Sequence, residues 1–417
     1  MDFENTRIIF HCDCNNFFAS CECLEHPELK NVPMAVAGDP QNRTGIVVAK
    51  NDLAKKCGVQ TTDTVYAARR KCPGIVFVRP RHHFYAEISR KVNSIFMEYT
   101  EYVEKASIDE SYLDVTDSLS YFKKTAPELA DALRCRIREE IGITISIGVS
   151  FNKIFAKLGS DYKKPDAVTV ITPDNYKEIL WPLPVNDMLF VGKSASTLLK
   201  KNNILTIRDL ACTDKKFLNQ LLGKSGEMLW SYANGLDEEP VRRFDEKPEV
   251  KSVSHGMTFK RNLMTADEVR TGLAVLADEV AVSLRKNHMK GCVISVHIKS
   301  PALVTISRQT KLDHYTHLQR EILDIAVELV QINWKIGASP IRALTIGVTG
   351  LVPEEEAPEQ LSLFDLGLDN DKKRQKSKLD RQRQEKLEDA MEKIRQKHGS
   401  GAISMGYHVN EDIGVHK

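Results

Sequence analysis

Hydrophobic and polar positions follow one another in a pattern that predicts strands and helices in turn up to Thr172. The run "RIIFHCDC" (7–14) is rich in branched apolar residues, which predicts a buried strand. Phe17, Cys21 and Leu24 then follow at helical spacing. Similar patterns predict helices at 82–103 and 153–165 and strands at 103–116 and 142–150. This alternation predicts an α+β fold for the first part of the chain.

Two short helical units follow, and each contains a glycine turn. In "FVGKSASTLL" (190–199) and "LLGKSGEMLW" (221–230) the glycine precedes a helix. Such turns can present backbone N–H groups to a phosphate. After a charged linker, four strand-like stretches and two amphipathic helices (266–286 and 318–334) predict a second α+β domain.

The bulk composition is that of an ordinary soluble protein. With 417 residues the chain is about three times a typical domain length, so we expect several domains. No apolar run reaches the roughly 20 residues that span a bilayer, and the first residues lack the basic start of a signal peptide. We therefore expect a cytoplasmic protein without a membrane partner. Its nine cysteines, an odd number, are expected to be free thiols.

Charge is distributed unevenly although the net charge is only +2. Pro240–Gly350 has 16 Lys/Arg against 11 Asp/Glu, and Leu351–Asp371 has 7 acidic residues and no basic one. Lys372–Lys397 has 11 basic against 5 acidic residues and a narrow apolar stripe at Leu387, Met391 and Ile394. Such local excesses suit phosphate contacts, but solvated surface helices explain them equally well.

The stretch "HCDCNNFFASCEC" (11–23) admits two interpretations. Two Cys-x-Cys pairs behind a histidine suggest zinc, yet zinc sites usually space their cysteines Cys-x2–4-Cys. On a strand, Cys12 and Cys14 point to one face and Asp13 to the other. The cysteines then fit a core layer, and the carboxylate between them is the stronger candidate for chemistry.

Acidic residues on two strands indicate a metal-dependent site. Asp13 ends the first buried strand, where the alternative is that it simply caps the next helix. Asp109 and Glu110 are adjacent in "SIDES", and a turn or bulge would let both side chains converge. Clustered buried carboxylates are costly unless cations neutralise them. Three carboxylates with two Mg²⁺ ions about 3.5–4 Å apart are an arrangement that drives phosphoryl transfer to a 3′-hydroxyl.

At these motifs the chain resembles the Y family of DNA polymerases, the translesion class with DNA polymerase IV and UmuC-like branches. "DCNNFFASCE" (13–22) resembles the first metal motif in its UmuC-like form, and "SIDESYLDV" (107–115) resembles the second. "GVSFNKIFAKLGSDYKKPD" (148–166) resembles the third, which ends in a nucleotide-contacting Lys-Pro. The resemblance covers about Ile8 to Leu351.

The resemblance implies an α+β right hand of several domains. These are a palm with a ferredoxin-like sheet (1–16 and 84–172), fingers (17–83), a helix-hairpin-helix thumb (173–238), a DNA-binding α+β little finger (248–350) and a connector with a basic tail helix (351–417). The partners implied are primer-template DNA and deoxynucleoside triphosphates, and we expect a monomer.

The resemblance also implies roles for individual residues. Asp13, Asp109 and Glu110 would bind two Mg²⁺ ions together with the backbone carbonyl of Cys14, and Glu110 would be the catalytic carboxylate. The residues implied at the nucleotide are Phe18 as steric gate against ribonucleotides, Phe17 beside it with its ring toward the core, and Lys55 and Lys164 at the triphosphate. For Lys55, an exposed helix position is the alternative.

Two positions depart from the family pattern. Many members have a tyrosine where this chain has Asp52, which puts a tyrosine contact to the phosphates in doubt and favours the UmuC-like branch. The first thumb hairpin usually has Gly-x-Gly, but here Phe190 precedes Val191 and Gly192. We therefore expect a weaker phosphate grip at that hairpin.

The pentapeptide "QLSLF" (360–364) lies in the acidic, proline-bearing connector, where a packed core has no use for its apolar residues. It resembles the bacterial sliding-clamp-binding motif, with Gln360, Leu361, Leu363 and Phe364 as the residues that fit a groove on the clamp. The alternative is a local hydrophobic contact with the tail helix.

Together these features predict a template-directed DNA polymerase that uses two Mg²⁺ ions and copies damaged template. A rival from another class is a non-catalytic scaffold that binds DNA and the clamp, which primer extension would distinguish. A zinc-binding DNA module, which stoichiometric zinc would reveal, is the third hypothesis.

Overall fold

The chain divides into two compact units. The computed structural model describes residues 6–40, 43, 45–246, 248–357, 370–399, 402–403 and 411–415. Residues 1–38 and 46–247 form the first unit, and 39–45 and 248–417 form the second. The proposed clamp-binding residues Gln360, Leu361, Leu363 and Phe364 lie outside the described residues. In the described ranges, no helix has the length and apolar character needed to cross a membrane.

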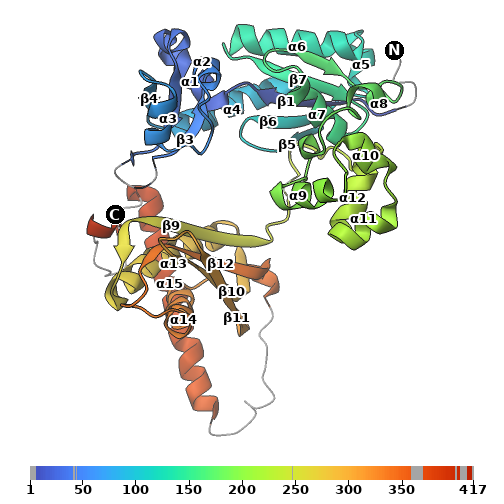
Figure 1. Cartoon of the computed structure of the whole chain (residues 1–417). Coiled ribbons are helices and arrows are strands. Elements are labelled where there is room, and N and C mark those ends of the chain that lie inside the picture. Colours follow the sequence, from blue (N-terminus) through green and yellow to red (C-terminus); the bar gives the residue numbers. More distant parts are fainter. Residues whose placement is uncertain are drawn as a thin grey trace. The chain divides into compact units, whose positions relative to one another are not determined.

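A five-stranded sheet in the order β5-β6-β1-β7-β8 forms the centre of the first unit (Figure 1). Strand β1 runs antiparallel to both β6 and β7, and β7 runs parallel to β8. The strands are β1 (Ile9–Cys14), β5 (Val103–Lys105), β6 (Glu110–Asp114), β7 (Ile145–Ser150) and β8 (Val168–Val170). The helices around this sheet are α4 (His82–Met97), α5 (Ser118–Phe122), α6 (Ala126–Glu140) and α7 (Lys153–Tyr162).

The side chains of β1 alternate between the two faces of this sheet. Phe10, Cys12 and Cys14 enter a core that also contains the apolar faces of α4 and α6. On the other face, Ile9 packs against Ala156 of α7. The fully buried strand thus separates an apolar layer from a layer that carries the charged residues of the site.

Helix α7 lies unusually close to the sheet because glycines face each other there. A Cβ on Gly148 would lie 1.8 Å from the carbonyl oxygen of Ala156, and one on Gly159 would lie 3.1 Å from the Cα of Gly148. Asn152 begins the helix as its N-cap and accepts a hydrogen bond from the Phe155 N–H. Side chains on this side of α7 therefore reach the strands directly.

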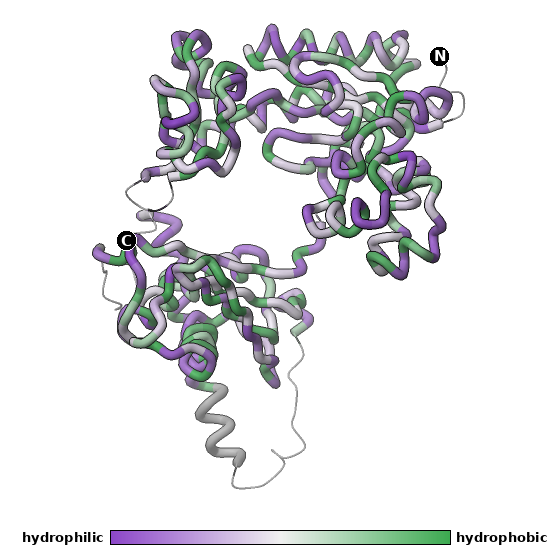
Figure 2. The backbone as a smooth tube through the Cα atoms, viewed as in Figure 1, coloured by the Kyte–Doolittle hydropathy of each residue, from purple (hydrophilic) through white to green (hydrophobic). Residues whose placement is uncertain are grey.

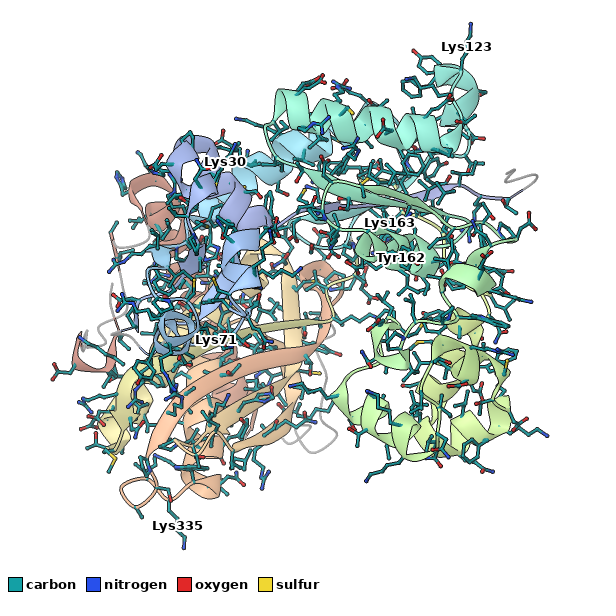
Figure 3. All side chains as sticks on the ribbon, turned by 45° about the horizontal axis from the view of Figure 1, so that its top comes forward. Lys30, Lys71, Lys123, Tyr162, Lys163 and Lys335 are labelled. Carbon is teal, nitrogen blue, oxygen red and sulfur yellow. The ribbon has the colours of Figure 1, made fainter. Side chains whose placement is uncertain are left out.

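A smaller sheet in the order β3-β2-β4 lies within the range expected for the fingers. Its own core contains Ala35, Val47, Ala54 and Ala68. Its strands are β2 (Met34–Ala37), β3 (Val47–Lys50) and β4 (Val76–Val78), and its helices are α1 (Phe17–Glu25), η1 (Pro27–Asn31), α2 (Asp52–Lys56) and α3 (Val65–Lys71). Lys30 of η1 and Lys71 of α3 are among the exposed lysines labelled in Figure 3.

Short helices make up the segment expected to be the thumb. They are α8 (Tyr176–Ile179), η3 (Val185–Asp187), α9 (Lys193–Lys201), α10 (Ile207–Cys212), α11 (Lys215–Leu222) and α12 (Lys224–Ala233). Both predicted glycine turns are present, because Gly192 precedes α9 and Gly223 precedes α12. The sequence prediction of two glycine-turn helices is therefore confirmed.

The second unit contains a four-stranded antiparallel sheet in the order β11-β10-β12-β9. The strands are β9 (Ser252–Leu263), β10 (Met289–Lys299), β11 (Thr305–Thr316) and β12 (Ile341–Pro353). Helices α13 (Ala266–Lys286) and α14 (Gln319–Asn333) cover one face, where Ile294, Val296 and Ile346 are buried. Hydrophilic and hydrophobic stretches alternate along these helices, as amphipathic helices require (Figure 2).

The C-terminal helix packs against this second unit. The turn η4 (Glu354–Glu356) follows β12, and α15 (Asn370–His398) and η6 (Glu411–Ile413) come later. Met391 of α15 is buried, and Ile413 joins the core. Leu387 and Ile394, the other two residues of the apolar stripe, are 50% and 40% exposed. Glu388 takes the buried place instead, because the Arg285 guanidinium donates a hydrogen bond to its carboxylate at 2.6 Å.

Candidate active site

The cysteines of the opening motif are core residues. Cys12 and Cys14 face away from Asp13, and burial raises the pKa of both thiols. The prediction of a small-residue core layer is confirmed, and the chemistry of this stretch belongs to the other face of β1.

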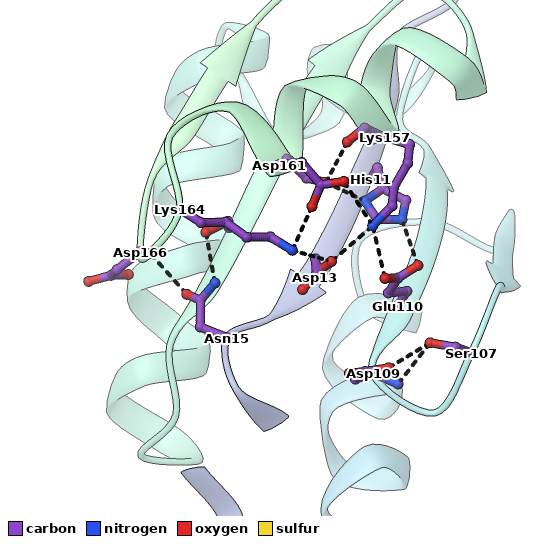
Figure 4. Close-up of polar contacts among 12 residues, drawn as sticks. His11, Asp13, Asn15, Ser107, Asp109, Glu110, Lys157, Asp161, Lys164 and Asp166 are labelled. Carbon is purple, nitrogen blue, oxygen red and sulfur yellow. Dashed lines mark hydrogen bonds and ion pairs between the residues drawn. The ribbon is translucent and has the colours of Figure 1, made fainter. Parts of the chain in front are cut away.

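Asp13 and Glu110 lie directly opposite each other on β1 and β6. Lys157 of α7 is placed between them: its Nζ is 3.0 Å from Asp13 Oδ2 and 2.8 Å from Glu110 Oε1 (Figure 4). The Lys157 side chain is only 13% exposed. One ammonium thus holds together two of the three predicted carboxylates.

A buried histidine, His11, contacts Glu110 on the side opposite solvent access, since its ring is fully buried. His11 Nδ1 is 2.7 Å from Ser160 Oγ, and His11 Nε2 is 3.5 Å from Glu110 Oε2. The His11 ring and, after it, Lys157 hold the pKa of Glu110 well below its ordinary value. Burial lowers the pKa of His11 itself. Burial raises the pKa of Asp13, although the nearby Lys157 and Lys164 oppose this.

Asp109 occupies the bend before β6, and its side chain turns away from the other two carboxylates. Its backbone carbonyl accepts a hydrogen bond from the Cys14 N–H at 3.0 Å, which fixes the end of β1. Its Oδ1 accepts a hydrogen bond from Ser107 Oγ at 2.6 Å. The bend therefore brings the backbone of Asp109 to the site, while the carboxylate is bound to Ser107 (Figure 4).

A second lysine reaches the site from the loop after α7. Lys164 Nζ is 2.6 Å from Asp13 Oδ2 and 2.7 Å from Asp161 Oδ1. The intervening Tyr162 and Lys163 are exposed to solvent (Figure 3). The Lys164 side chain is itself 31% exposed, but its ammonium is held at the site by Asp13, as expected for a residue of the site.

The loop that carries Lys164 is held at Asp166. The Asp166 N–H donates to Asn15 Oδ1 at 2.9 Å, and Arg134 Nη1 donates to Asp166 Oδ1 at 2.6 Å. Arg138 donates to the other carboxylate oxygen of Asp166 at 3.0 Å. These contacts join the loop to the end of β1 and to α6.

Both phenylalanines of the motif lie at the start of α1. Phe17 is buried in the core under the sheet, as predicted. Phe18 is half-buried and stacks on Tyr85 of α4, with ring centroids 4.3 Å apart. This stacking fixes the Phe18 ring close to the strand that carries Asp13.

Lys55 lies exposed in the last turn of α2. Within the described residues, no hydrogen bond or ion pair joins it to the carboxylates. On the same helix, Asp52 accepts a hydrogen bond from the Asn16 side chain at 3.1 Å. The structure therefore links Asp52, rather than Lys55, to the end of β1.

The donors present fit Mg²⁺. All three carboxylates offer oxygen, the ligand type that this cation prefers. Three carboxylates, those of Asp13, Glu110 and Asp161, form ion pairs with the two lysines, which leaves a local net charge of −1 before Asp109 is added. Among the described residues, no three acidic, histidine or cysteine side chains are already gathered as a metal site. Binding would therefore require that Asp109 turn inward and that Lys157 give up its contacts.

Sequence reasoning missed several residues of this site, namely His11, Asn15, Arg134, Lys157 and Asp161. Lys157 and Asp161 were inside the third motif, and their i, i+4 spacing places them on one face of α7. His11 shares a face of β1 with Asp13. Arg134 has no comparable signal, because only the folded structure brings α6 next to the loop at Asp166.

Comparison with known proteins identifies the family of the chain. Residues 12–161 match the model of the impB/mucB/samB family, and residues 250–363 match its C-terminal domain. The chain is 42% identical to DNA polymerase IV of Acetivibrio thermocellus over 96% of its length and 97% of that protein. It is 35% identical to DNA polymerase IV 1 of Bacillus subtilis, over 96% and 93% of the two chains.

Solved structures show the same fold. A Y-family DNA polymerase chimera of Dbh and Dpo4 superimposes with a TM-score of 0.73, at 24% identity over 83% of this chain and 99% of that one. Both relatives described above are named DNA polymerase IV, so the comparisons favour that branch over the UmuC-like branch that Asp52 suggested. The chain belongs to the impB/mucB/samB family, that is, to the Y family of DNA polymerases.

Proposed function

We propose that this chain extends a primer opposite template DNA, damaged template included, and that Asp13, Asp109 and Glu110 carry out the phosphoryl transfer. Membership of the family makes it a translesion DNA polymerase. The residue assignment rests on one observation: the register of β1 and β6 sets Asp13 opposite Glu110, where one ammonium bridges both. Two carboxylates this close bind a cation, whether an ammonium or a metal.

In this proposal the three carboxylates and the backbone carbonyl of Cys14 hold two Mg²⁺ ions. When bound, such ions lower the pKa of the primer 3′-hydroxyl and neutralise charge on the triphosphate. The protein's own residues orient the ligands: His11 supports Glu110, and the Asp109 carbonyl fixes the end of β1. Lys164, which contacts Asp13 in this structure, would bind triphosphate oxygens together with Lys55.

Phe18 acts as the steric gate in this proposal. Its ring is fixed by stacking on Tyr85, so it cannot move aside for an added 2′-hydroxyl without disturbing α4. Phe17 faces the core and contributes only packing. A rigid clash discriminates better than an apolar pocket alone, which reaches only about a hundredfold.

The open face of the second unit's sheet is suited to the DNA backbone. The face opposite α13 and α14 carries hydroxyl, amide and cationic side chains. The strand register places on it Ser252, Ser254, Ser295, His297, Lys299, Thr305, Ser307, Gln309, Lys311, Thr345 and Thr349. Lys299 and Lys311 give this face positive charge, and Asp313, the next residue in the alternation of β11 and 89% exposed, is an acidic residue on it. Hydroxyls and lysines are common phosphate donors that carry no sequence preference.

The clamp-binding motif remains part of the proposal. Gln360, Leu361, Leu363 and Phe364 would fit a groove on a bacterial sliding clamp, and the chain would act as a cytoplasmic monomer tethered there. Replacing Leu363 and Phe364 by Ala should leave distributive synthesis intact and remove stimulation by a loaded clamp. An equal loss of activity without clamp would show that these residues are structural.

The experiment that tests the proposal is primer extension by the Glu110→Ala variant. Extension should be abolished while primer-template binding stays nearly unchanged, because phosphates are bound mainly by lysines and backbone amides. If the variant still extended primers, Glu110 would not be the catalytic carboxylate. A non-catalytic scaffold, the rival hypothesis, predicts that the unaltered protein also fails to extend a primer when Mg²⁺ and deoxynucleotides are supplied.

A further inference from the structure

The turn before α9 holds a phenylalanine in a backbone conformation that suits glycine. The Val191 N–H donates to the Met188 carbonyl at 3.1 Å and closes a four-residue turn. Phe190, the third residue of this turn, has φ +67°. Turns of this type favour Gly or Asn at that position, and a bulky residue there is strained. Local backbone preference therefore opposes phenylalanine at 190.

Core packing does not explain this residue either. Its neighbours Leu189 and Val191 both pack against the hydrophobic core of the short helices. Phe190 points outward and is 65% exposed. The ring contact made by Phe190 in the described structure is with Tyr232 of α12, at 5.9 Å between centroids. A strained, outward-pointing aromatic ring at a fixed position suggests a ligand contact.

The surface beside Phe190 suits a phosphate backbone. Gly192 is the N-cap of α9 and provides no side-chain hydrogen bond to the first turn, so those amide groups are available. Lys193 follows directly and is exposed. The second glycine turn repeats this arrangement with Gly223 and Lys224 before α12. An apolar ring next to phosphate donors matches a nucleotide, whose sugar lies beside its phosphate.

We infer that Phe190 packs its ring against a deoxyribose of the DNA strand whose phosphates bind at the start of α9. The inference rests on the proposed polymerase function. It assigns to the Phe190 ring a contact with the sugar that a glycine at this position could not make. A ribose would be a poorer partner, because its 2′-hydroxyl would lose water against the ring without gaining a hydrogen bond.

The test compares Phe190→Gly with Phe217→Ala, a control on α11 that removes another exposed ring, 41% exposed, from an ordinary helical position. Two quantities are measured for each: the unfolding temperature and the affinity for primer-template DNA at several salt concentrations. Phe190→Gly should keep or raise the unfolding temperature, because the backbone strain is relieved. It should weaken DNA binding about five- to tenfold, the lower range for one aromatic contact with a nucleotide.

The salt dependence separates a sugar contact from a phosphate contact. Phe190→Gly should leave the slope of log affinity against log salt unchanged, whereas Lys193→Ala should reduce it by about 0.9, one phosphate contact. Phe217→Ala should change neither affinity nor slope. The loss caused by Phe190→Gly should also be larger on a DNA primer strand than on an RNA one.

Binding within twofold of the unaltered protein would overturn the inference. So would a lowered unfolding temperature in both Phe190→Gly and Phe190→Asn, since that would make the ring a packing element. Both results are distinct from failure of the proposed function, which would appear as an absence of primer extension in the unaltered protein.

Discussion

Replacing Lys157 by Met removes the ammonium that bridges Asp13 and Glu110 while keeping most of the side-chain volume. Two facing carboxylates are then left without their shared counter-charge, in a place where Asp13 is only 7% exposed. We expect the metal-free variant to be clearly less stable than the parent protein. Mg²⁺ should restore more stability to the variant than to the parent, because no ammonium competes for the carboxylate oxygens.

The contact distances set the magnitude. At 3.0 and 2.8 Å, each ion pair represents about 5–6 kcal/mol of Coulomb attraction at an effective dielectric of 20, before desolvation is subtracted. Breaking one partner out of a buried pair costs about 3–5 kcal/mol. Glu110 is 27% exposed and Asp13 keeps Lys164, so about 2–3 kcal/mol is the expected loss. In a unit of this size that lowers the unfolding temperature by about 5–10 °C.

Calorimetry in EDTA and in millimolar Mg²⁺ measures this effect, with Lys153→Met as the matched control. Lys153 lies one turn earlier on α7 and forms a buried ion pair with Glu104 at 2.6 Å, away from the three carboxylates. Its loss should destabilise the unit by a similar amount that Mg²⁺ does not restore. The reasoning fails if Lys157→Met is as stable as the parent, or if Mg²⁺ rescues both variants equally.

Three further changes test other parts of the structure. In single-nucleotide extension, Phe18→Ala should keep the rate of deoxynucleotide incorporation within about tenfold of the parent. It should raise ribonucleotide use relative to deoxynucleotide use by about a hundred- to a thousandfold, which is ~3–4 kcal/mol at 1.4 kcal/mol per factor of ten. The same effect in Phe17→Ala would contradict the assignment of Phe18. Gly148→Ala should lower the free energy of unfolding by about 3 kcal/mol or more and impair primer extension. The reason is that the new Cβ would lie 1.8 Å from the Ala156 carbonyl oxygen and displace α7. An unchanged urea midpoint of unfolding would disprove this. Burial, with the nearby Lys290 charge, lowers the pKa of His317 to about 4. The free energy of unfolding of the second unit should therefore fall by up to about 3 kcal/mol as pH falls from 6.5 to 4, at 1.36 kcal/mol per pKa unit. Here the unfolded chain binds the proton first, and calorimetry of His317→Gln should show no such loss from this residue.

Much of the fold could be predicted because apolar periodicity reports directly on burial. The strands β1, β7, β10 and β12 and the helices α4, α7, α13 and α14 all lie where the pattern predicted them. The packing of the C-terminal helix α15 was harder to predict. Its pattern predicted an apolar stripe, but Glu388 is buried because Arg285 and the Gln319 N–H donate to its carboxylate. A charged residue in a sequence gives no sign that its partner lies about a hundred positions away.

The site was predictable to the extent that its residues sit in short motifs on neighbouring strands. Asp13 and Glu110 could be brought together from the alternation of strand faces, and the register of β1 and β6 places them opposite each other. The orientation of the Asp109 side chain could not be predicted, because the bend before β6 brings Ser107 within hydrogen-bond distance of its carboxylate. Lys157 was also missed, since helical spacing shows which face a residue occupies but not how closely that face approaches a sheet.

That distance is set by glycine, which connects the packing of α7 to the chemistry of the site. Gly148 on β7 and Gly159 on α7 let the two backbones meet, and a side chain on Gly148 would force them apart. Only at this short distance can Lys157 reach two strands at once and His11 reach Ser160. The charges of the site therefore depend on two residues that have no side chain. A lysine at 157 on a helix held farther out would be an ordinary surface residue, and the opposed carboxylates would have no counter-charge before a cation binds.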